Sequence, residues 1–357
     1  MTTQQLTDEA VALLQQLIAI PSVSRDEKAA ADLLFNVITG YGLTPHRKGN
    51  NVWCLSRLWD DEKDIILLNA HIDTVKPVST WTRDPFAPTV EGDRLYGLGS
   101  NDCGGGLVSL LQVFRHLDSL PELQHNYIYL ASCEEEVSGA GGIRAVIGDS
   151  ELTPLFQTSR ITAIVGEPTG MQPAIAERGL MVIDGIAHGK SGHAARGEGI
   201  NAINEALDDL LFIRNHRFKK VSPLLGETRM QCTVINSGTQ HNVVPDECRF
   251  IIDVRTNEFY ANEFVLSFLR GKLKSTLTAR STHLRSSSIP ESHPLVQKCI
   301  AMGKIPFGSP TLSDQALMPW PSFKLGPGES SRSHSADEFI CVSEINAAIE
   351  TYLHLLG

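Results

Sequence analysis

Hydrophobic residues along the chain recur with two periods, one typical of amphipathic helices and one of buried strands. Apolar positions over 13–18 share one helical face, and Pro21 ends that pattern. Three short apolar runs, 65–68, 127–130 and 161–165, are flanked by polar loops and have the length of strands buried on both faces. The pattern therefore predicts strands and helices in alternation, beginning with a helix.

This alternation over 1–176 predicts an α/β domain, in which helices flank both faces of a central, mostly parallel sheet. The C-terminal segment, 289–357, returns to this domain and ends in an amphipathic helix. Between them, strand-like and helical runs over 177–288 predict a smaller inserted α+β domain. Asn262 is expected to cap a helix of this insertion.

The composition is that of a globular protein with an excess of acidic residues. The 357 residues are 42% hydrophobic and carry a formal net charge of −10. This charge argues against non-specific binding to nucleic acid or to an anionic membrane. The polar, acidic N-terminus does not resemble a targeting signal, and the seven scattered cysteines fit reduced thiols. We therefore expect a cytoplasmic protein without nucleic-acid or membrane partners.

Acidic residues and a histidine directly follow the three buried strands. His71 and Asp73 come after the first strand, Glu134–Glu136 after the second and Glu167 after the third, while Asp102 precedes a predicted helix. Ligands of open α/β sheets bind at the carboxyl ends of the strands, so these side chains should converge there. Crowded carboxylates repel one another and are costly to bury. One or two divalent cations would neutralise them.

Each of these pieces alone has an ordinary explanation, such as a surface His–Asp pair or a solvated run of glutamates. Their order is more specific, because it matches five segments of a known family. The chain resembles the dinuclear-zinc amidohydrolases and peptidases, a family that includes acetylornithine deacetylase, succinyl-diaminopimelate desuccinylase, aminoacylase and carboxypeptidase G. The resemblance is strongest to the acetylornithine deacetylase branch. It is carried by the segments Asn-Ala-His-Ile-Asp-Thr-Val (69–75), Tyr-Gly-Leu-Gly-Ser-Asn-Asp (96–102), Cys-Glu-Glu-Glu (133–136), Gly-Glu-Pro-Thr (166–169) and Ser-His-Ser-Ala-Asp-Glu (333–338).

The resemblance implies two divalent metal ions and a set of five protein ligands. His71 and Glu167 would bind one ion, Glu136 and His334 the other, and Asp102 would bridge them. Mixed histidine and carboxylate ligands suit zinc, with cobalt or manganese as alternatives. The resemblance also implies a catalytic domain with an inserted lid and dimerisation domain of the ferredoxin-like type.

Two further acids are expected to act beside the metals. The resemblance implies that Asp73 hydrogen-bonds the far nitrogen of His71 and that Glu135 is the general base. The chain departs from the family at Cys103, where a Lys or Met is usual, and at Glu134, where the acidic run usually begins with Asp. The run of three glutamates leaves a one-residue uncertainty about which of them is the base and which the ligand.

The resemblance assigns substrate contacts to the insertion and to a late loop. His193 would stabilise the oxyanion in the active site of a partner subunit, which implies a homodimer formed through the insertion. Asn242 and Arg255 match positions that hold substrate, although a surface ion pair explains Arg255 equally well from the sequence alone. Gly326 and Gly328 match a loop that offers backbone amides to the substrate.

These expectations point to hydrolysis of a small N-acyl amino acid of the N-acetyl- or N-succinyl-ornithine or -citrulline type. The free amino acid would be released in arginine biosynthesis. The residues leave open the acyl group, the amine side chain and the native metal. The alternatives are a di- or tripeptidase or a desuccinylase on the same scaffold and, less favoured, a binding module without catalytic activity.

Overall fold

The computed structural model describes residues 1–150, 152–157 and 160–357. These residues form two compact units, which we call the large unit and the inserted unit. The large unit consists of Met1–Ile175, Ile289–Phe307 and Ser313–Gly357, and the inserted unit of Ala176–Ser288 and Gly308–Leu312. The boundaries expected from the sequence, 176/177 and 288/289, lie within one residue of this division. The sequence pattern gives no sign of the short second piece of the inserted unit.

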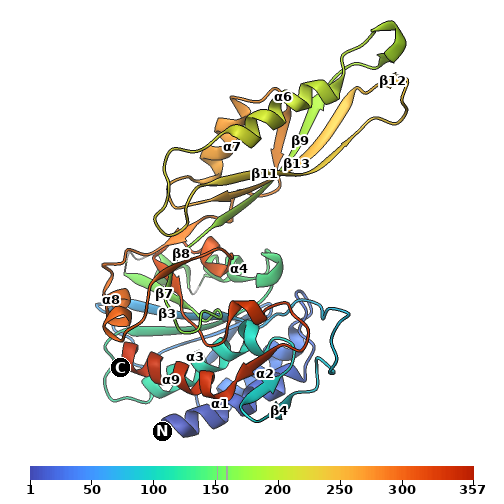
Figure 1. The fold of residues 1–357 in the computed structure, drawn as a ribbon. Helices are drawn as coiled ribbons and strands as arrows, with labels where there is room; N and C mark the ends of the chain where they lie inside the picture. The colour runs from blue at the N-terminus through green and yellow to red at the C-terminus, as the bar shows by residue number, and fades with distance from the viewer. Residues whose placement is uncertain (151, 158–159) are drawn as a thin grey trace. The chain divides into compact units, whose positions relative to one another are not determined.

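A mixed sheet forms the centre of the large unit, with the strand order β1-β2-β6-β3-β7-β17-β8. Of these strands, β3, β7 and β8 are labelled in Figure 1. The four middle strands, β6, β3, β7 and β17, are parallel, whereas the flanking pairs are antiparallel. The expected α/β fold with a mostly parallel central sheet is therefore confirmed: the centre of the sheet is parallel, and its antiparallel edges make it mixed. The strands are β1 (Pro45–Lys48), β2 (Asn51–Leu55), β3 (Ile65–His71), β6 (Asn126–Ser132), β7 (Ile161–Val165), β8 (Ala174–Glu177) and β17 (Ser322–Lys324).

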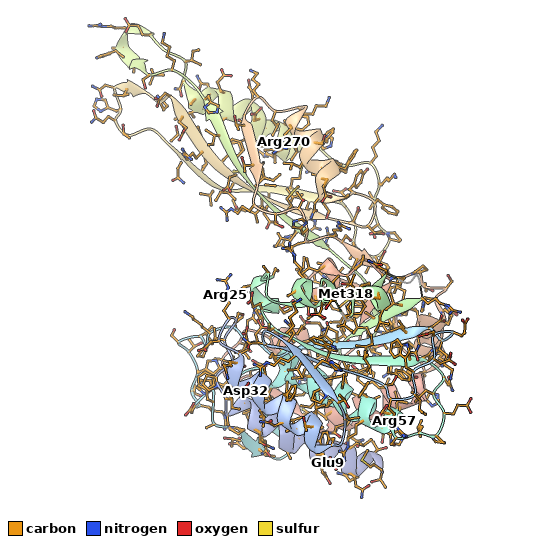
Figure 2. All side chains as sticks on the ribbon, turned by 180° about the vertical axis from the view of Figure 1, so that it is seen from behind. Glu9, Arg25, Asp32, Arg57, Arg270 and Met318 are labelled. Carbon is orange, nitrogen blue, oxygen red and sulfur yellow. The ribbon has the colours of Figure 1, made fainter. Side chains whose placement is uncertain are left out.

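Burial on both faces explains why the central strands read as continuous apolar runs. In β3, Ile66 and Leu68 enter one hydrophobic core, while Ile65 and Leu67 enter a second core on the opposite face. Because neither face meets water, no polar alternation is needed. Met318, labelled in Figure 2, belongs to the second core.

Helices cover both faces of this sheet. The first core is covered by five helices, among which α1, α3 and α9 lie side by side (Figure 1). They are α1 (Thr3–Ile18), α2 (Lys28–Gly40), α3 (Gly105–Asp118), α8 (Pro294–Ala301) and α9 (Val342–Leu356). The second core is covered by α4 (Ile143–Ile147) and α5 (Thr153–Phe156). A small antiparallel sheet of β4 (Thr89–Glu91), β5 (Arg94–Tyr96) and β18 (Phe339–Cys341) completes the large unit.

The inserted unit has the ferredoxin-like order of elements, β-α-β-β-α-β. Its antiparallel sheet runs β11-β13-β9-β14, and its helices pack on one face through a separate hydrophobic core. Two short strands, β10 (Gly192–His193) and β12 (Val243–Val244), pair outside that sheet, and β15 (Ser287–Ser288) pairs with the end of β8. The main elements are β9 (Gly179–His188), α6 (Ala202–Asn215), β11 (Arg229–Ser237), β13 (Glu247–Thr256), α7 (Asn262–Arg270) and β14 (Thr276–Ala279).

Asn262 does not cap α7, contrary to the expectation from the sequence. The capping position belongs to Ala261. The Asn262 side chain instead accepts a hydrogen bond from Thr256 Oγ1 and donates to the backbone carbonyls of Leu180 and Leu284. The buried Asn262 side chain thus joins the start of α7 to β9 and to the segment that follows β14. No helix among the described residues is long and apolar enough to cross a membrane.

Gly106 sets how closely α3 approaches the end of β7. A Cβ atom at residue 106 would lie 1.8 Å from the carbonyl oxygen of Gly166, so the Gly106→Ala variant must displace backbone. We expect overpacking of about 1–3 kcal/mol, seen as a thermal midpoint lowered by at least about 2 °C. Gly40→Ala is the matched control, because nothing lies within 4 Å of its added Cβ atom. Equal midpoints for the two variants would contradict this account of the packing.

Candidate metal centre

The parallel order of β6, β3 and β7 brings their carboxyl ends to one edge of the sheet. His71 is the last residue of β3, Glu167 follows β7 after Gly166, and the Glu134–Glu136 run follows β6. Asp102 lies in the turn that leads into α3. Residues far apart in sequence therefore meet as the strand pattern predicts.

The carboxylate of Asp102 stands between two histidines. Its Oδ1 lies 3.2 Å from His71 Nε2, and its Oδ2 lies 3.6 Å from His334 Nε2. Each histidine also has an acid of its own: Glu167 Oε1 lies 3.7 Å from His71 Nε2, and Glu136 Oε1 lies 3.0 Å from His334 Nε2. The five side chains thus form two histidine–carboxylate pairs that share Asp102.

The charges of this cluster are unbalanced without a cation. Burial raises the pKa of Glu167 to about 7, and its Oε1, a buried atom, accepts no hydrogen bond from the described residues. Burial also raises the pKa of Glu135 well above its ordinary range, and the charges of Glu167, Asp314 and Glu136 add to that effect. Imidazole nitrogens and carboxylate oxygens are ligands of divalent transition metals. The residues present therefore fit metal ions.

Asp73 contacts His71 differently from the expectation. His71 Nδ1 lies 2.8 Å from the backbone carbonyl oxygen of Asp73 and 3.6 Å from its Oδ1. The Asp73 carboxylate instead accepts hydrogen bonds from the backbone amides of Glu135 and Glu136, at 3.0 and 3.1 Å, and from Ser24 Oγ at 2.7 Å. Since the carbonyl already faces the ring, the carboxylate is left to hold the glutamate turn.

The three consecutive glutamates have different surroundings. Glu134 has a positive φ of 54°, and its Oε2 accepts a hydrogen bond from the Gly141 amide at 3.2 Å. A Cβ atom on Gly139 or Gly141 would lie 1.9 or 2.4 Å from that carboxylate, so a larger residue at either position would have to displace the Glu134 side chain. Glu134 is thus part of the glycine turn, whereas Glu136 faces His334. Glu135 lies close enough to His71 for the charge of that histidine to lower its pKa, against the larger effect of burial.

Two buried acids near the centre have no role in the expectations from the sequence. Glu338 accepts hydrogen bonds from three backbone amides of the Asp102 turn. Asp314 is 4% exposed and accepts a hydrogen bond from Ser132 Oγ at the end of β6, and burial raises its pKa to about 6. Glu338 belongs to the last family segment, but Asp314 follows no strand, and no local pattern distinguishes it from a surface aspartate.

The expected substrate residues of the inserted unit lie in two places. His193 and Asn242 are exposed neighbours around the β10–β12 pair, where His193 Nδ1 accepts from the Ala195 amide and the Asn242 carbonyl from the Ala194 amide. Arg255 lies at the end of β13 and forms a bidentate pair with Asp253, with distances of 2.9 and 3.2 Å. The ion pair weighed for Arg255 from the sequence is therefore present.

The late glycine loop packs against the residues after β7. The Gly326 amide donates to Thr169 Oγ1 at 3.2 Å, so it already has a partner within the protein. Gly328 has a positive φ of 82°, and its carbonyl accepts from the Gly170 amide at 2.7 Å. A Cβ atom on Gly328 would lie 2.3 Å from Asn101 Oδ1. A Cβ atom on Gly326 would lie 2.4 Å from the backbone carbonyl oxygen of Glu167, so close packing explains both glycines.

The order of these segments is matched by a protein-family model. Residues 67–357 match the model described as "Peptidase family M20/M25/M40". The chain belongs to this family. The resemblance seen in the sequence is thereby confirmed, and this M20 protein is a metal-dependent amidohydrolase.

Two relatives of this M20 chain share the name acetylornithine deacetylase. Acetylornithine deacetylase of Proteus mirabilis is 28% identical over 97% of this chain and 95% of its own length. The enzyme of the same name from Erwinia tasmaniensis is 28% identical over 92% of each chain.

Solved structures share the fold of this M20 chain at low sequence identity. Aminopeptidase PepT of Bacillus cereus superposes with a TM-score of 0.75 at 16% identity, covering 99% of this chain and 98% of its own. A Bacillus subtilis protein described as a dinuclear metal binding peptidase from the M20 family gives a TM-score of 0.73 at 17% identity, with coverages of 99% and 98%. These likenesses show the fold.

Proposed function

We propose that this amidohydrolase cleaves the amide bond of a small N-acyl amino acid of the N-acetyl- or N-succinyl-ornithine or -citrulline type. The observation that carries the proposal is the similarity to acetylornithine deacetylase, which extends over 97% of the chain. Release of the free amino acid would serve arginine biosynthesis. The cytoplasmic location expected from the composition is part of the same proposal.

The metal ligands we propose are the five side chains around Asp102. His71 and Glu167 would hold one divalent ion, Glu136 and His334 the other, and Asp102 would contact both. The distances of 3.0–3.7 Å between these groups support the assignment. Zinc suits the ligand set, with cobalt or manganese as alternatives. Bound ions would supply Lewis-acid activation of the attacking water and of the amide carbonyl.

Glu135 is the general base of this proposal. It takes a proton from the water that attacks the carbonyl carbon and passes it to the amide nitrogen as the C–N bond breaks. Burial raises the pKa of the Glu135 carboxyl above its ordinary range, which is the direction expected for a carboxylate that takes up a proton during the reaction. The hydrogen bond from the Glu135 amide to Asp73 fixes the backbone that carries this base.

The positive end of the inserted sheet supports a substrate with a free carboxylate. Arg229 lies directly across from Arg255 in the β11–β13 register. Burial lowers the pKa of the nearby Arg178, and the positive charges of Arg229 and Arg255 lower it further. Like charges placed directly opposite each other destabilise a sheet. Asp253 offsets part of this excess, and a substrate carboxylate would offset more.

A di- or tripeptidase, or a desuccinylase, is the second candidate on the same scaffold. The observation that favours peptidase activity is the fold similarity to an aminopeptidase, with a TM-score of 0.75 over 99% of this chain. The two candidates differ in the amine end of the substrate, since an aminopeptidase must accept a free amino terminus.

We also propose a homodimer formed through the inserted unit. β11 is an edge strand with mostly exposed residues, and Val234 and Ile235 on it are 41% and 50% exposed. Leu207 and Leu211, one turn apart on the neighbouring α6, are 48% and 50% exposed. A second copy would cover this apolar edge. In such a dimer, His193 of the partner subunit would stabilise the oxyanion.

The substrate class is tested by measuring amine release from a panel of compounds. The panel holds N-acetyl and N-succinyl forms of ornithine, citrulline, lysine and diaminopimelate, together with dipeptides. We expect one acylated amino acid to turn over in the presence of zinc or cobalt and not after chelation, because the activated water is lost with the metal. Cleavage of dipeptides alone would move the assignment to a peptidase.

The assignment of the base predicts a contrast between two neighbouring glutamates. Glu135→Gln should lower kcat by about 100-fold or more on the best substrate of the panel, while the metal content stays unchanged. Glu134→Gln is the matched control and should retain most activity, because its carboxylate faces the Gly141 amide. Metal analysis accompanies both kinetic measurements. A larger loss for Glu134→Gln would show that the assigned register is wrong.

The dimer is tested by measuring light scattering of the protein as it elutes from a size-exclusion column. Wild type should have twice the 39.0 kDa mass of one chain, and a Leu211→Glu, Ile235→Glu variant should have the mass of a monomer. The charges would stay exposed on the monomer but would be buried without partners in the dimer. Ile305→Lys, at a 72% exposed residue of the large unit, is the control. A monomeric wild type would refute the proposed assembly.

A further inference from the structure

Glu338 connects two turns that each carry a proposed metal ligand. It lies four residues after His334, and its side chain is 2% exposed. Its Oε1 accepts hydrogen bonds from the amides of Asn101 and Asp102 at 2.8 and 2.9 Å, and its Oε2 accepts from Gly99 at 3.1 Å. Both oxygens of this buried carboxylate therefore hold the backbone on which Asp102 is mounted.

A second set of hydrogen bonds joins the same two turns. Asn101 Oδ1 accepts from the amide of Glu329 at 3.0 Å, and Asn101 Nδ2 donates to the Glu329 carbonyl at 3.1 Å and to Ser333 Oγ at 3.4 Å. Glu338 contributes its own carbonyl as well, which accepts from the Gly97 amide at 3.0 Å. His334 thus lies on a segment that is attached to the Asp102 turn on both sides.

The position of Glu338 differs from that of its neighbour Asp337. Asp337 points to the surface, where its carboxylate accepts from the amides of Thr82 and Arg83 and from Thr82 Oγ1. None of these partners belongs to a turn that carries a proposed ligand. The two adjacent acids therefore form a matched pair, in which only Glu338 contacts the backbone of Asp102.

A carboxylate is the side chain that can satisfy this arrangement. Three amides point at two oxygens, and an ionised carboxylate offers about four acceptor positions and no donor. Glutamine would offer one acceptor oxygen and would direct an NH₂ group toward at least one N–H group. Fixing the amide of Asp102 also fixes its Cα atom, and with it the direction from which its carboxylate reaches the two histidines.

We propose that Glu338 is a positioning residue that holds the Asp102 carboxylate between the two metal positions and so makes the binding of both ions depend on one buried side chain. The inference rests on the ligand assignment made above. Because Asp102 serves both positions, loss of Glu338 should weaken both ions together. Loss of His334 should weaken one ion more than the other.

The test is a metal titration of the full-length protein after chelation, with Co²⁺ and Zn²⁺ as probes. Cobalt absorbance and calorimetry report the two affinities, and thermal unfolding of the metal-free protein reports the fold. We expect Glu338→Gln to weaken both ions by about 10–100-fold, as removal of a group that orients a metal ligand does. Asp337→Asn is the control and should leave both affinities within about twofold of wild type.

Glu338→Asp provides the conservative rescue, because it keeps both acceptor oxygens but withdraws them by one methylene. Its affinities should lie between those of wild type and Glu338→Gln. If Glu338→Gln does not fold, Glu338→Asp decides the matter: both ions bound at least about threefold more weakly would support the proposal, and wild-type affinities would overturn it.

Several outcomes would overturn the inference. Unchanged affinities in Glu338→Gln with a lowered thermal midpoint would mean that the residue only stabilises the fold. Loss of one ion alone would contradict the coupling through Asp102. A wild-type protein that takes up fewer than two ions would refute the ligand assignment itself, and with it this proposal, and that failure is visible before any variant is made.

Discussion

The structure depends on bringing several carboxylates close together at one edge of a sheet. Asp102, Glu136 and Glu167 lie within hydrogen-bonding or ion-pairing distance of two histidines, and Glu135 lies near them. Like charges at such spacing oppose folding unless positive charge compensates them. The parallel central strands supply the convergence, because their ends share one edge. The histidines and bound cations would supply the compensation.

Acidic side chains also shape the turns that carry the candidate ligands. Asp73 accepts the amides of Glu135 and Glu136, Glu338 accepts that of Asp102, and the fully buried Glu27 accepts that of Glu134 at 3.2 Å. Hydrogen bonds to a charged group contribute about 1.5–3 kcal/mol each. Turns that lack a regular ladder are therefore defined by carboxylates rather than by strand pairing. The same residue type serves here both as candidate ligand and as scaffold.

The predictable parts of the molecule are those with a local signature. Two-sided burial makes β3, β6 and β7 read as apolar runs, and their parallel order places His71 and Glu167 together. The contacts of Asp73 and Glu338 have no such signature. The bond from the Asp102 amide to Glu338 spans 236 residues, and no periodicity records which amide a distant carboxylate will accept. Asp314 escapes detection for the same reason, since it is distinguished only by what buries it.

The side chains proposed to bind metal and those proposed to bind substrate belong to different units. The candidate ligands and the base all belong to the large unit, whereas His193, Asn242 and Arg255 belong to the inserted unit. The candidate metal centre in the large unit indicates the class of reaction. The choice of substrate is argued instead from charges in the inserted unit, such as the Arg229–Arg255 pair.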